Sequence, residues 1–287
     1  MAKSPAHRFG QIIGDILEDT LYEYCLTIAN NHNLYLDHKH ARPAREDRKE
    51  VRWDDINGNT HKLDLVMEKD GSEESFGAPK AFIEVAWRRY TKHAKAKAQE
   101  ISAAVKPLVA KYYESSPFFG AVLAGEFTET SLDQMRSEGF EVLYFSTSII
   151  EDAYAAKGVD AHWDESTPEE ELQSRVEQME NMSDEDKKAI GHMLMETNKE
   201  QWDRFVEKLN ISLARSIQNI RVLALYGEMH DFMNINEACD YIAKNADESE
   251  NVKIYKYEIT VIFTNGDKIE IQFKEKSNAI IYLRQLE

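Results

Sequence analysis

Hydrophobic and polar positions follow two different periods along the first half of the chain. Apolar residues recur at three- and four-residue steps over residues 9–24 and 91–113, which predicts two helices, each with one buried face. Pro107 is expected to kink or break the second of them. Short apolar runs bounded by turn-forming residues predict strands. These runs cover residues 50–56, 62–68, 80–87, 118–124 and 140–146, and shorter helices are expected at 129–138 and 147–156.

The order of these elements indicates the fold class. One helix precedes three strands, and helices then alternate with two further strands. The first strands follow one another closely and are expected to be antiparallel, whereas the helical crossovers require the later strands to be parallel. The sequence therefore predicts an α/β fold (an α+β mixed sheet), with residues 30–48 as a polar, irregular connection.

The second half of the chain has a different pattern, acidic and rich in methionine. Asn265-Gly266 is a strong hairpin signal between two apolar, alternating segments. The expected elements are helices within 167–226 and at 234–245 and 277–286, and strands at 252–263 and 269–273. No internal repeat is evident. We expect a first domain at residues 1–157 and a second at 158–287 that serves recognition, oligomerisation or sensing.

Composition excludes several classes of protein. The chain has 287 residues and a mass of 33.1 kDa, enough to bury a full core. No apolar run approaches the roughly 20 residues that a membrane-spanning helix needs, and the polar start lacks an apolar signal core. Cys25 and Cys239 cannot form a disulfide framework. We therefore expect a cytoplasmic protein with buried thiols and no membrane partner.

Charge is distributed unevenly along the chain. The net charge of −17 speaks against a general nucleic-acid coat protein. Residues 1–150 carry a net charge of only −4, while residues 151–287 carry −13. Basic residues also gather locally in the first half, at Arg42, Arg45, Arg48 and Lys49 and again over residues 88–97. A nucleic acid, if bound, is therefore expected on the N-terminal half.

Two carboxylates lie inside apolar strand-like segments. Asp64 stands within Leu63-Asp64-Leu65-Val66, and Glu84 stands within Phe82-Ile83-Glu84-Val85. A buried charge is costly unless it is compensated, and two carboxylates on neighbouring strands repel each other unless a cation lies between them. Hard oxygen ligands suit Mg²⁺ or Mn²⁺, which would polarise a phosphate and activate a water. The alternative is that both residues are polar edge-strand positions facing water.

Asp64, Glu84-Val85-Ala86 on the next strand and the helix that contains residues 95–101 together resemble the PD-(D/E)xK nuclease superfamily. The resemblance covers roughly residues 8–155 and implies a restriction-endonuclease-like core with Asp64 and Glu84 as metal ligands. It also implies that Gln99 and an acidic residue of the first helix belong to the site. Glu18 is the candidate on that helix, with Asp15 second. The alternatives are a solvated helix face for Glu18 and a surface amide for Gln99.

One position departs from the family pattern. The lysine of the motif would fall at position 86, where this chain has Ala86. An engineered substitution of the lysine is the explanation that the intact surroundings favour, and it would make this chain an inactivated Lys-to-Ala form of the enzyme. The chain could also be a naturally inactivated binder, or the lysine could have migrated, with Lys92, Lys95 or Arg88 reaching back from the next helix.

Basic residues around the proposed site point to a nucleic-acid partner. Arg88, Arg89, Lys92 and Lys95, with Lys97 beside them, are candidates for contacts to DNA phosphates. A solvated helix face is the alternative for this group. The basic cluster at 42–49 could reach a groove or form a flexible loop. Asp37-His38-Lys39-His40 is a weak metal motif, because no second ligand cluster has matching spacing.

The resemblance implies a metal-dependent endonuclease that hydrolyses double-stranded DNA, as in a bacterial type II-like restriction endonuclease, with Mg²⁺ as cofactor and Mn²⁺ as substitute. Cleavage of both strands requires two active sites, so a homodimer is expected. Two alternatives stay open. One is another phage-defence or repair nuclease of the same superfamily with a sensing C-terminal domain, and the other is a non-catalytic DNA-binding module.

Overall fold

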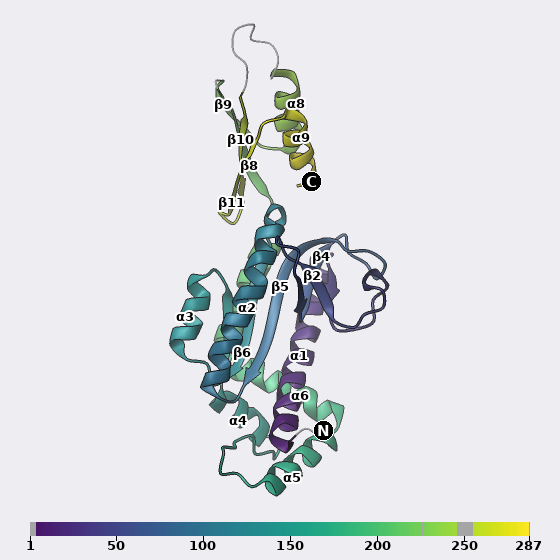
Figure 1. The fold of residues 1–287 in the computed structure, drawn as a ribbon, viewed down its shortest axis with the longest axis vertical. Coiled ribbons are helices and arrows are strands. Elements are labelled where there is room, and N and C mark those ends of the chain that lie inside the picture. The colour runs from purple at the N-terminus through teal and green to yellow at the C-terminus, as the bar shows by residue number, and fades with distance from the viewer. Residues whose placement is uncertain (1–3, 226, 246–254, 287) are drawn as a thin grey trace. The chain divides into compact units, whose positions relative to one another are not determined.

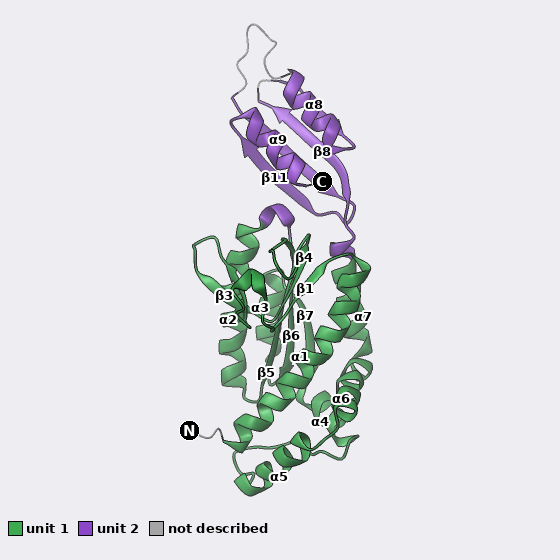
Figure 2. Cartoon of the chain, turned by 90° about the vertical axis from the view of Figure 1, so that its right-hand side faces the viewer, with its two compact units in different colours: residues 1–112, 117–210 green, residues 113–116, 211–287 purple. Residues whose placement is uncertain are grey.

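The computed structural model describes residues 4–225, 227–245 and 255–286. The chain divides into two compact units (Figure 2). Unit 1 comprises residues 1–112 and 117–210, and unit 2 comprises residues 113–116 and 211–287. Each unit is described separately below.

Unit 1 is built around a mixed β-sheet, which confirms the predicted α/β class (Figure 1). Its elements in chain order are α1 (Pro5–Asn31), β1 (Tyr35–Asp37), η1 (Pro43–Arg45), β2 (Val51–Asp54), β3 (Thr60–Leu63), β4 (Leu65–Lys69), β5 (Ala78–Arg88), α2 (Thr91–Lys111), β6 (Phe118–Gly125), α3 (Glu129–Ser137), β7 (Glu141–Ser146), α4 (Thr147–Ala155), α5 (Glu169–Glu180), α6 (Asp184–Thr197) and α7 (Lys199–Leu213).

The main sheet has the strand order β1-β4-β5-β6-β7. The strands β1, β4 and β5 pair antiparallel, and β5, β6 and β7 pair parallel, as the order of the elements predicts. β2 and β3 form a separate antiparallel hairpin. The long strand β5 is therefore central, with antiparallel neighbours on one side and parallel neighbours on the other.

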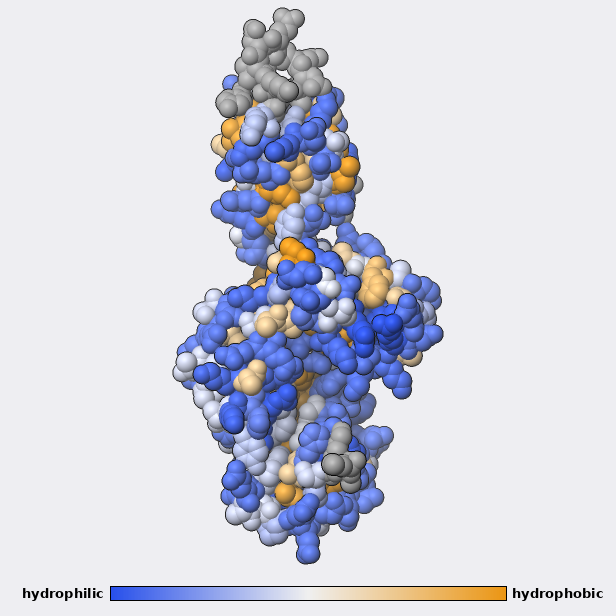
Figure 3. Space-filling view, viewed as in Figure 1, coloured by the Kyte–Doolittle hydropathy of each residue, from blue (hydrophilic) through white to orange (hydrophobic). Residues whose placement is uncertain are grey.

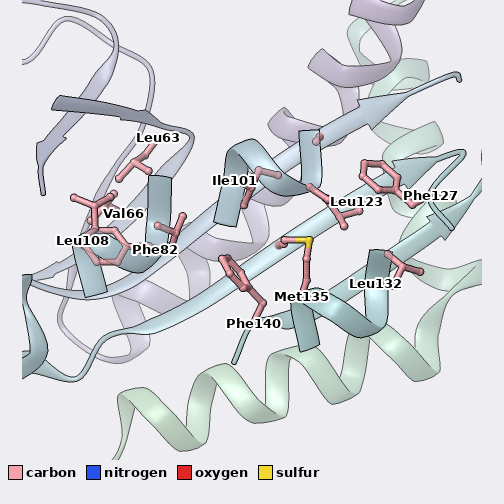
Figure 4. Packing of buried hydrophobic residues seen from close by; sticks show 14 of the residues in the cluster. Leu63, Val66, Phe82, Ile101, Leu108, Leu123, Phe127, Leu132, Met135 and Phe140 are labelled. Carbon is pink, nitrogen blue, oxygen red and sulfur yellow. The ribbon is translucent and has the colours of Figure 1, made fainter. Parts of the chain in front are cut away.

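Helices cover both faces of this sheet. On one face, α2 and α3 pack against apolar side chains of β4, β5 and β6, and Figure 4 shows Ile101 and Met135 in this layer with Leu123 of β6. On the other face lies α1, where Gly10 allows close approach to the Trp87 indole of β5. α7 packs on that face too, since a Cβ at Gly120 of β6 would overlap the Phe205 ring. Both faces of β5 are thus buried.

Local sequence signals account for several helix boundaries. Pro5 stands in the first turn of α1, where a missing N–H costs nothing, and the Ser4 hydroxyl accepts the His7 N–H. Thr128 and Ser146 cap α3 and α4 in the same way. Both α1 and α2 have the length to cross a bilayer, but no helix in the described ranges is apolar enough to do so.

Three predicted boundaries in unit 1 were wrong. The expected strand at 62–68 is divided at Asp64, where a bend separates the β2–β3 hairpin from the main sheet. The expected loop at 30–48 contains β1, which is only three residues long and pairs with β4. Pro107 does not end α2, which continues to Lys111, and its carbonyl accepts the Ile56 N–H.

The expected domain boundary after residue 157 was also wrong. The structure divides the chain after residue 210, because α5, α6 and α7 pack against unit 1. Met179 of α5 is fully buried, and Phe205 of α7 packs edge-to-face on Phe118 of β6, with ring centroids 5.6 Å apart. The acidic composition that suggested a separate domain belongs to the exposed face of these helices.

Unit 2 is a four-stranded antiparallel sheet with two helices. Its principal elements are β8 (Ile217–Ala224), β9 (Met229–Phe232), α8 (Ile235–Asn245), β10 (Tyr257–Phe263), β11 (Lys268–Phe273) and α9 (Lys276–Gln285), with the strand order β11-β10-β8-β9. The helix expected to reach residue 226 ends at Leu213, and two strands follow. The alternation of buried positions along β8 is a strand signal that the helical interpretation overlooked.

The order strand, strand, helix occurs twice in unit 2, as β8-β9-α8 and as β10-β11-α9. The first strands of the two halves, β8 and β10, pair antiparallel at the centre of the sheet, with Arg221 opposite Thr260. The repetition concerns the order of the elements.

Candidate active site

Asp64 and Glu84 come together on adjacent strands, as the sequence predicts. Leu65 of β4 pairs with Ile83 of β5, so the preceding residue, Asp64, lies opposite Glu84. The Val85 backbone N–H donates to Asp64 Oδ2 over 2.7 Å. Glu84 is only 4% exposed. The polar-edge alternative for Glu84 is therefore wrong, because this side chain does not face water.

The pair is only partly compensated by neighbouring groups. Glu84 Oε1 is buried and has no hydrogen-bond partner. Burial raises the pKa of Glu84 well above its usual range, and the neighbouring Asp64 charge raises it further. Burial also raises the pKa of Asp64, against the opposing effects of the Val85 N–H and the Lys97 ammonium. A buried carboxylate pair of this kind favours the binding of a proton or a cation.

A cleft of about 830 Å³ opens beside the pair in unit 1. Its walls come from α1, from the C-terminal end of β5 and from the start of α2. Asp64 and Glu18 line the cleft together with Ala86 and Lys97. Gly10 and Gly14 of α1 form part of one wall. α1, the sheet and α2 thus bring Asp15, Glu18 and Asp64 to one cavity, while Glu84 is buried next to Asp64 and is not part of the cavity lining.

Glu18 is part of this site, as proposed from the resemblance. Its pKa is raised to about 7, first by burial and then by the nearby Asp64 charge, while Lys39 opposes the shift. Asp15 also lines the cleft and contributes to the same shift. The alternative of a fully solvated helix face is wrong for Glu18, which can gain or lose a proton near neutral pH.

Position 86 is small, and another residue supplies positive charge nearby. Ala86 is 3% exposed and follows Glu84 by two residues in β5, so both face the same side of the sheet. Lys97 of α2 lines the cleft, and its charge lowers the pKa of both Asp64 and Glu84. Its side chain is 17% exposed and pairs with Glu100 at 2.9 Å. Lys97 is therefore the lysine whose charge acts most strongly on the two carboxylates.

The structure does not bring Gln99 or Lys95 into the cleft. Both line a small cavity between α2 and α3, beside Met135 and Glu138. Lys92 is exposed at the start of α2 and is not among the residues that line the cleft. The helical period places these residues on faces of α2 different from that of Lys97.

The two arginines at the end of β5 have different environments. Arg88 lines the cleft, donates to the Trp87 carbonyl at 2.7 Å and acts on the Asp64 charge. Arg89 is largely buried, donates to the Trp163 carbonyl and lies 3.6 Å from the Glu126 carboxylate. Arg89 also lines the cleft, but these contacts tie it to the segment around residue 163, and its expected role as a DNA contact stays a prediction.

The basic cluster at 42–49 is partly buried, so it is not a flexible loop over its whole length. Arg42 is completely buried and Arg45 is 5% exposed, whereas Arg48 and Lys49 are exposed. Arg42 pairs with Glu68, and Arg45 pairs with Asp37. Sequence alone gave no sign of this, because the pairing depends on how β1 and β4, which carry Asp37 and Glu68, come together in the sheet.

Comparison with protein-family models and with curated proteins gives no match. Among solved structures, one described as a crystal structure of a protein of unknown function, AF1548, is similar with a TM-score of 0.28 and 13% identity. The match covers 70% of this chain and 98% of that one. A similarity of this strength carries no inference about fold or activity, so the site is interpreted from its own geometry.

The residues present fit a divalent cation in one specific way. No group of three or more His, Cys, Asp or Glu side chains in the described ranges is arranged to hold a metal ion by itself. The buried, unpartnered Glu84 Oε1 beside Asp64 nevertheless calls for a cation or a proton. Mg²⁺ commonly binds through one or two carboxylates and completes its octahedron with waters and substrate phosphates. The pair fits that mode.

Proposed function

We propose that this chain is a metal-dependent endonuclease of the PD-(D/E)xK type that hydrolyses phosphodiester bonds in DNA, similar to a type II restriction endonuclease. The observation that carries the proposal is the Asp64–Glu84 pair on adjacent strands. Asp64 lines a cleft, and the buried Glu84 beside it has one carboxylate oxygen without a hydrogen-bond partner. Carboxylates with raised pKa values in a cleft are typical of functional sites.

Asp64 and Glu84 would hold one or two Mg²⁺ ions, for which Mn²⁺ can substitute. Bound there, the ion supplies positive charge to the phosphate and lowers the pKa of a water. The two side chains are well suited to this role, because the Val85 N–H fixes the Asp64 carboxylate and β5 fixes Glu84.

We propose that Lys97 takes the place of the family's lysine, which is absent at Ala86. Among the described residues, Lys97 is the cation that acts on both carboxylates and lines the cleft. Its ammonium can stabilise the negative charge that builds up on the phosphate in the transition state. Glu18, with a pKa of about 7, is placed to exchange a proton in the same cavity.

The surface of unit 1 is compatible with a charged ligand. Over unit 1, the face drawn in Figure 3 is mostly hydrophilic, and apolar residues occur there in small separate groups. Double-stranded DNA is the partner we propose, held by Arg88 and Lys97, which line the cleft. Cleavage of both strands by a single-site chain would require a homodimer. Unit 2, which carries its own core, is then available for recognition or sensing.

The proposal is tested by cleavage of supercoiled plasmid and phage DNA in Mg²⁺, Mn²⁺ or EDTA. The unmodified chain should cleave only with a divalent ion, and Asp64→Asn and Glu84→Gln should abolish cleavage. Asp47→Asn is the matched control, because Asp47 is exposed and its left-handed backbone (φ 59°) suits asparagine. Cleavage that survives Asp64→Asn would overturn the proposal, and DNA binding without cleavage would favour the non-catalytic module.

A further inference from the structure

Lys39 lies in the turn at residues 38–40, which follows the end of β1. Asp37, the last residue of β1, pairs with Val66 of β4. Lys39 comes two residues after Asp37, and Asp64 comes two residues before Val66. Asp64 in turn lies opposite Glu84 of β5. The turn that carries Lys39 is therefore at the end of the strand next to the carboxylate pair, on the side away from β6.

The charge of Lys39 reaches the site. It opposes the rise in the pKa of Glu18 and also acts on Asp64. Lys39 is exposed, and none of the described residues forms a hydrogen bond or an ion pair with its ammonium. It does not line the cleft that contains Asp64 and Glu18. The Lys39 ammonium is thus outside the cleft, near enough to Glu18 and Asp64 for its charge to act on them, and it can bind a ligand.

A buried network of four charges lies directly beneath this turn. Arg42 contacts Asp37 at 2.8 Å and Glu68 at 2.6 Å, and Arg45 makes a second ion pair with Asp37. Arg42 also donates to the Ser72 carbonyl. The four charged side chains are at most 2% exposed in these ion pairs. Every one of them has therefore lost its hydration.

This network holds the backbone on both sides of Lys39. The Arg45 guanidinium donates to the His40 carbonyl at 2.7 Å and to the His38 carbonyl at 3.3 Å. Buried ion pairs often contribute little net stability, because the cost of desolvating the charges offsets their attraction. A network of this kind is better explained by the geometry that it imposes, and the geometry here is the position of residues 38–40.

We propose that Lys39 binds a phosphate of the substrate strand next to the scissile phosphate, outside the cleft. The inference rests on the proposed nuclease function and adds a requirement to it. If the scissile phosphate lies at Asp64, the strand must continue past β1 to reach Lys39. The enzyme would then need at least one further nucleotide beyond the scissile phosphate, on the side of β1.

The test is binding, so that it does not depend on catalysis. A fluorescein-labelled 30-base-pair duplex of mixed sequence is titrated with the protein in EDTA and in Ca²⁺, at several salt concentrations. Lys39→Ala should weaken binding several-fold and reduce the slope of log affinity against log salt by about 1, the value of one lost phosphate contact. Lys49→Ala is the matched control, since it removes the same charge from an exposed position in the following loop.

A second measurement locates the phosphate. Duplexes in which single phosphates are replaced by neutral methylphosphonates are bound to the unmodified chain and to Lys39→Ala. One neutral position should weaken the unmodified chain and leave Lys39→Ala unaffected. Equal behaviour of Lys39→Ala and Lys49→Ala would overturn this inference alone. Absence of any duplex binding by the unmodified chain would overturn the inference and the DNA partner together, whereas cleavage of DNA by Asp64→Asn would overturn only the proposed catalysis.

Discussion

The Val85 backbone N–H donates to the Asp64 carboxylate over 2.7 Å, across the junction of β4 and β5. This bond fixes Asp64 at the bend that leads from the β2–β3 hairpin into the main sheet. It also places Asp64 beside Glu84, the neighbour of Val85 in β5. The chain thus brings two carboxylates together while leaving one buried oxygen, Glu84 Oε1, without a hydrogen-bond partner.

Replacement of Glu84 by glutamine should separate metal binding from folding. The amide has the same shape but no charge to offer, so Mg²⁺ should no longer stabilise the protein. In thermal unfolding, 10 mM Mg²⁺ should raise the Tm of the unmodified chain by a few degrees and leave the Tm of Glu84→Gln unchanged. Asp47→Asn should respond as the unmodified chain does. An equal rise in Glu84→Gln would mean that the ion binds elsewhere.

The raised pKa of Glu18 predicts a particular pH dependence of stability. Between about pH 4.5 and 7 the unfolded chain releases this proton while the folded chain retains it, so Glu18 lowers the free energy of unfolding progressively across this interval. Above about pH 7 the loss is constant. Glu18→Gln removes this effect and should be more stable than the unmodified chain at pH 8, with the difference vanishing near pH 4.5.

This difference is measured as the Tm of each protein in EDTA across the pH range, so that no divalent ion masks the carboxylates. A stabilisation by Glu18→Gln that is the same at pH 4.5 and pH 8 would contradict the assignment of a raised pKa to Glu18.

The proposal that Lys97 replaces the lysine missing at position 86 can be tested by moving the lysine from one position to the other. Lys97→Ala should lower the rate of DNA cleavage by about 10²- to 10³-fold, the usual cost of removing one group that stabilises transition-state charge. Lys97→Ala combined with Ala86→Lys should recover part of the rate, because a lysine at 86 would face the same side of β5 as Glu84. Lys95→Ala, on another face of α2, is the control. Full activity of Lys97→Ala would leave Arg88 as the remaining candidate in the cleft.

Arg45 should act on DNA binding only through the turn that carries Lys39. Arg45→Lys keeps the buried charge but loses the forked contact to the His38 and His40 carbonyls. We expect it to weaken duplex binding about as much as Lys39→Ala, and the double variant to be no weaker than either single one. Additive effects would show that Arg45 acts independently of Lys39.

The apolar periods of the sequence were sufficient to predict much of unit 1. They predicted α1, α2 and the strands β5, β6 and β7, because each of these elements carries a regular apolar pattern within its own residues. They also singled out Asp64 and Glu84, since a carboxylate inside such a pattern is conspicuous. The short strand β1 was missed, because three residues are too few for a period to emerge.

The remaining features depend on pairings between distant segments. Nothing near Arg42 in the sequence indicates that it will pair with Glu68, and nothing near Lys39 indicates that its charge will act on Asp64. Both facts follow from the register of β1 against β4, which the sequence does not reveal. The domain boundary was misplaced for the same reason, since acidic composition describes the exposed face of α5–α7 and not the surface on which they pack.

The most direct test is the conversion of supercoiled plasmid by the unmodified chain in Mg²⁺ and in Mn²⁺, with Asp64→Asn purified and assayed in parallel. The account predicts nicked and linear products with either ion, none in EDTA and none from Asp64→Asn. Intact plasmid under all conditions, from a folded protein that still binds DNA, would contradict it.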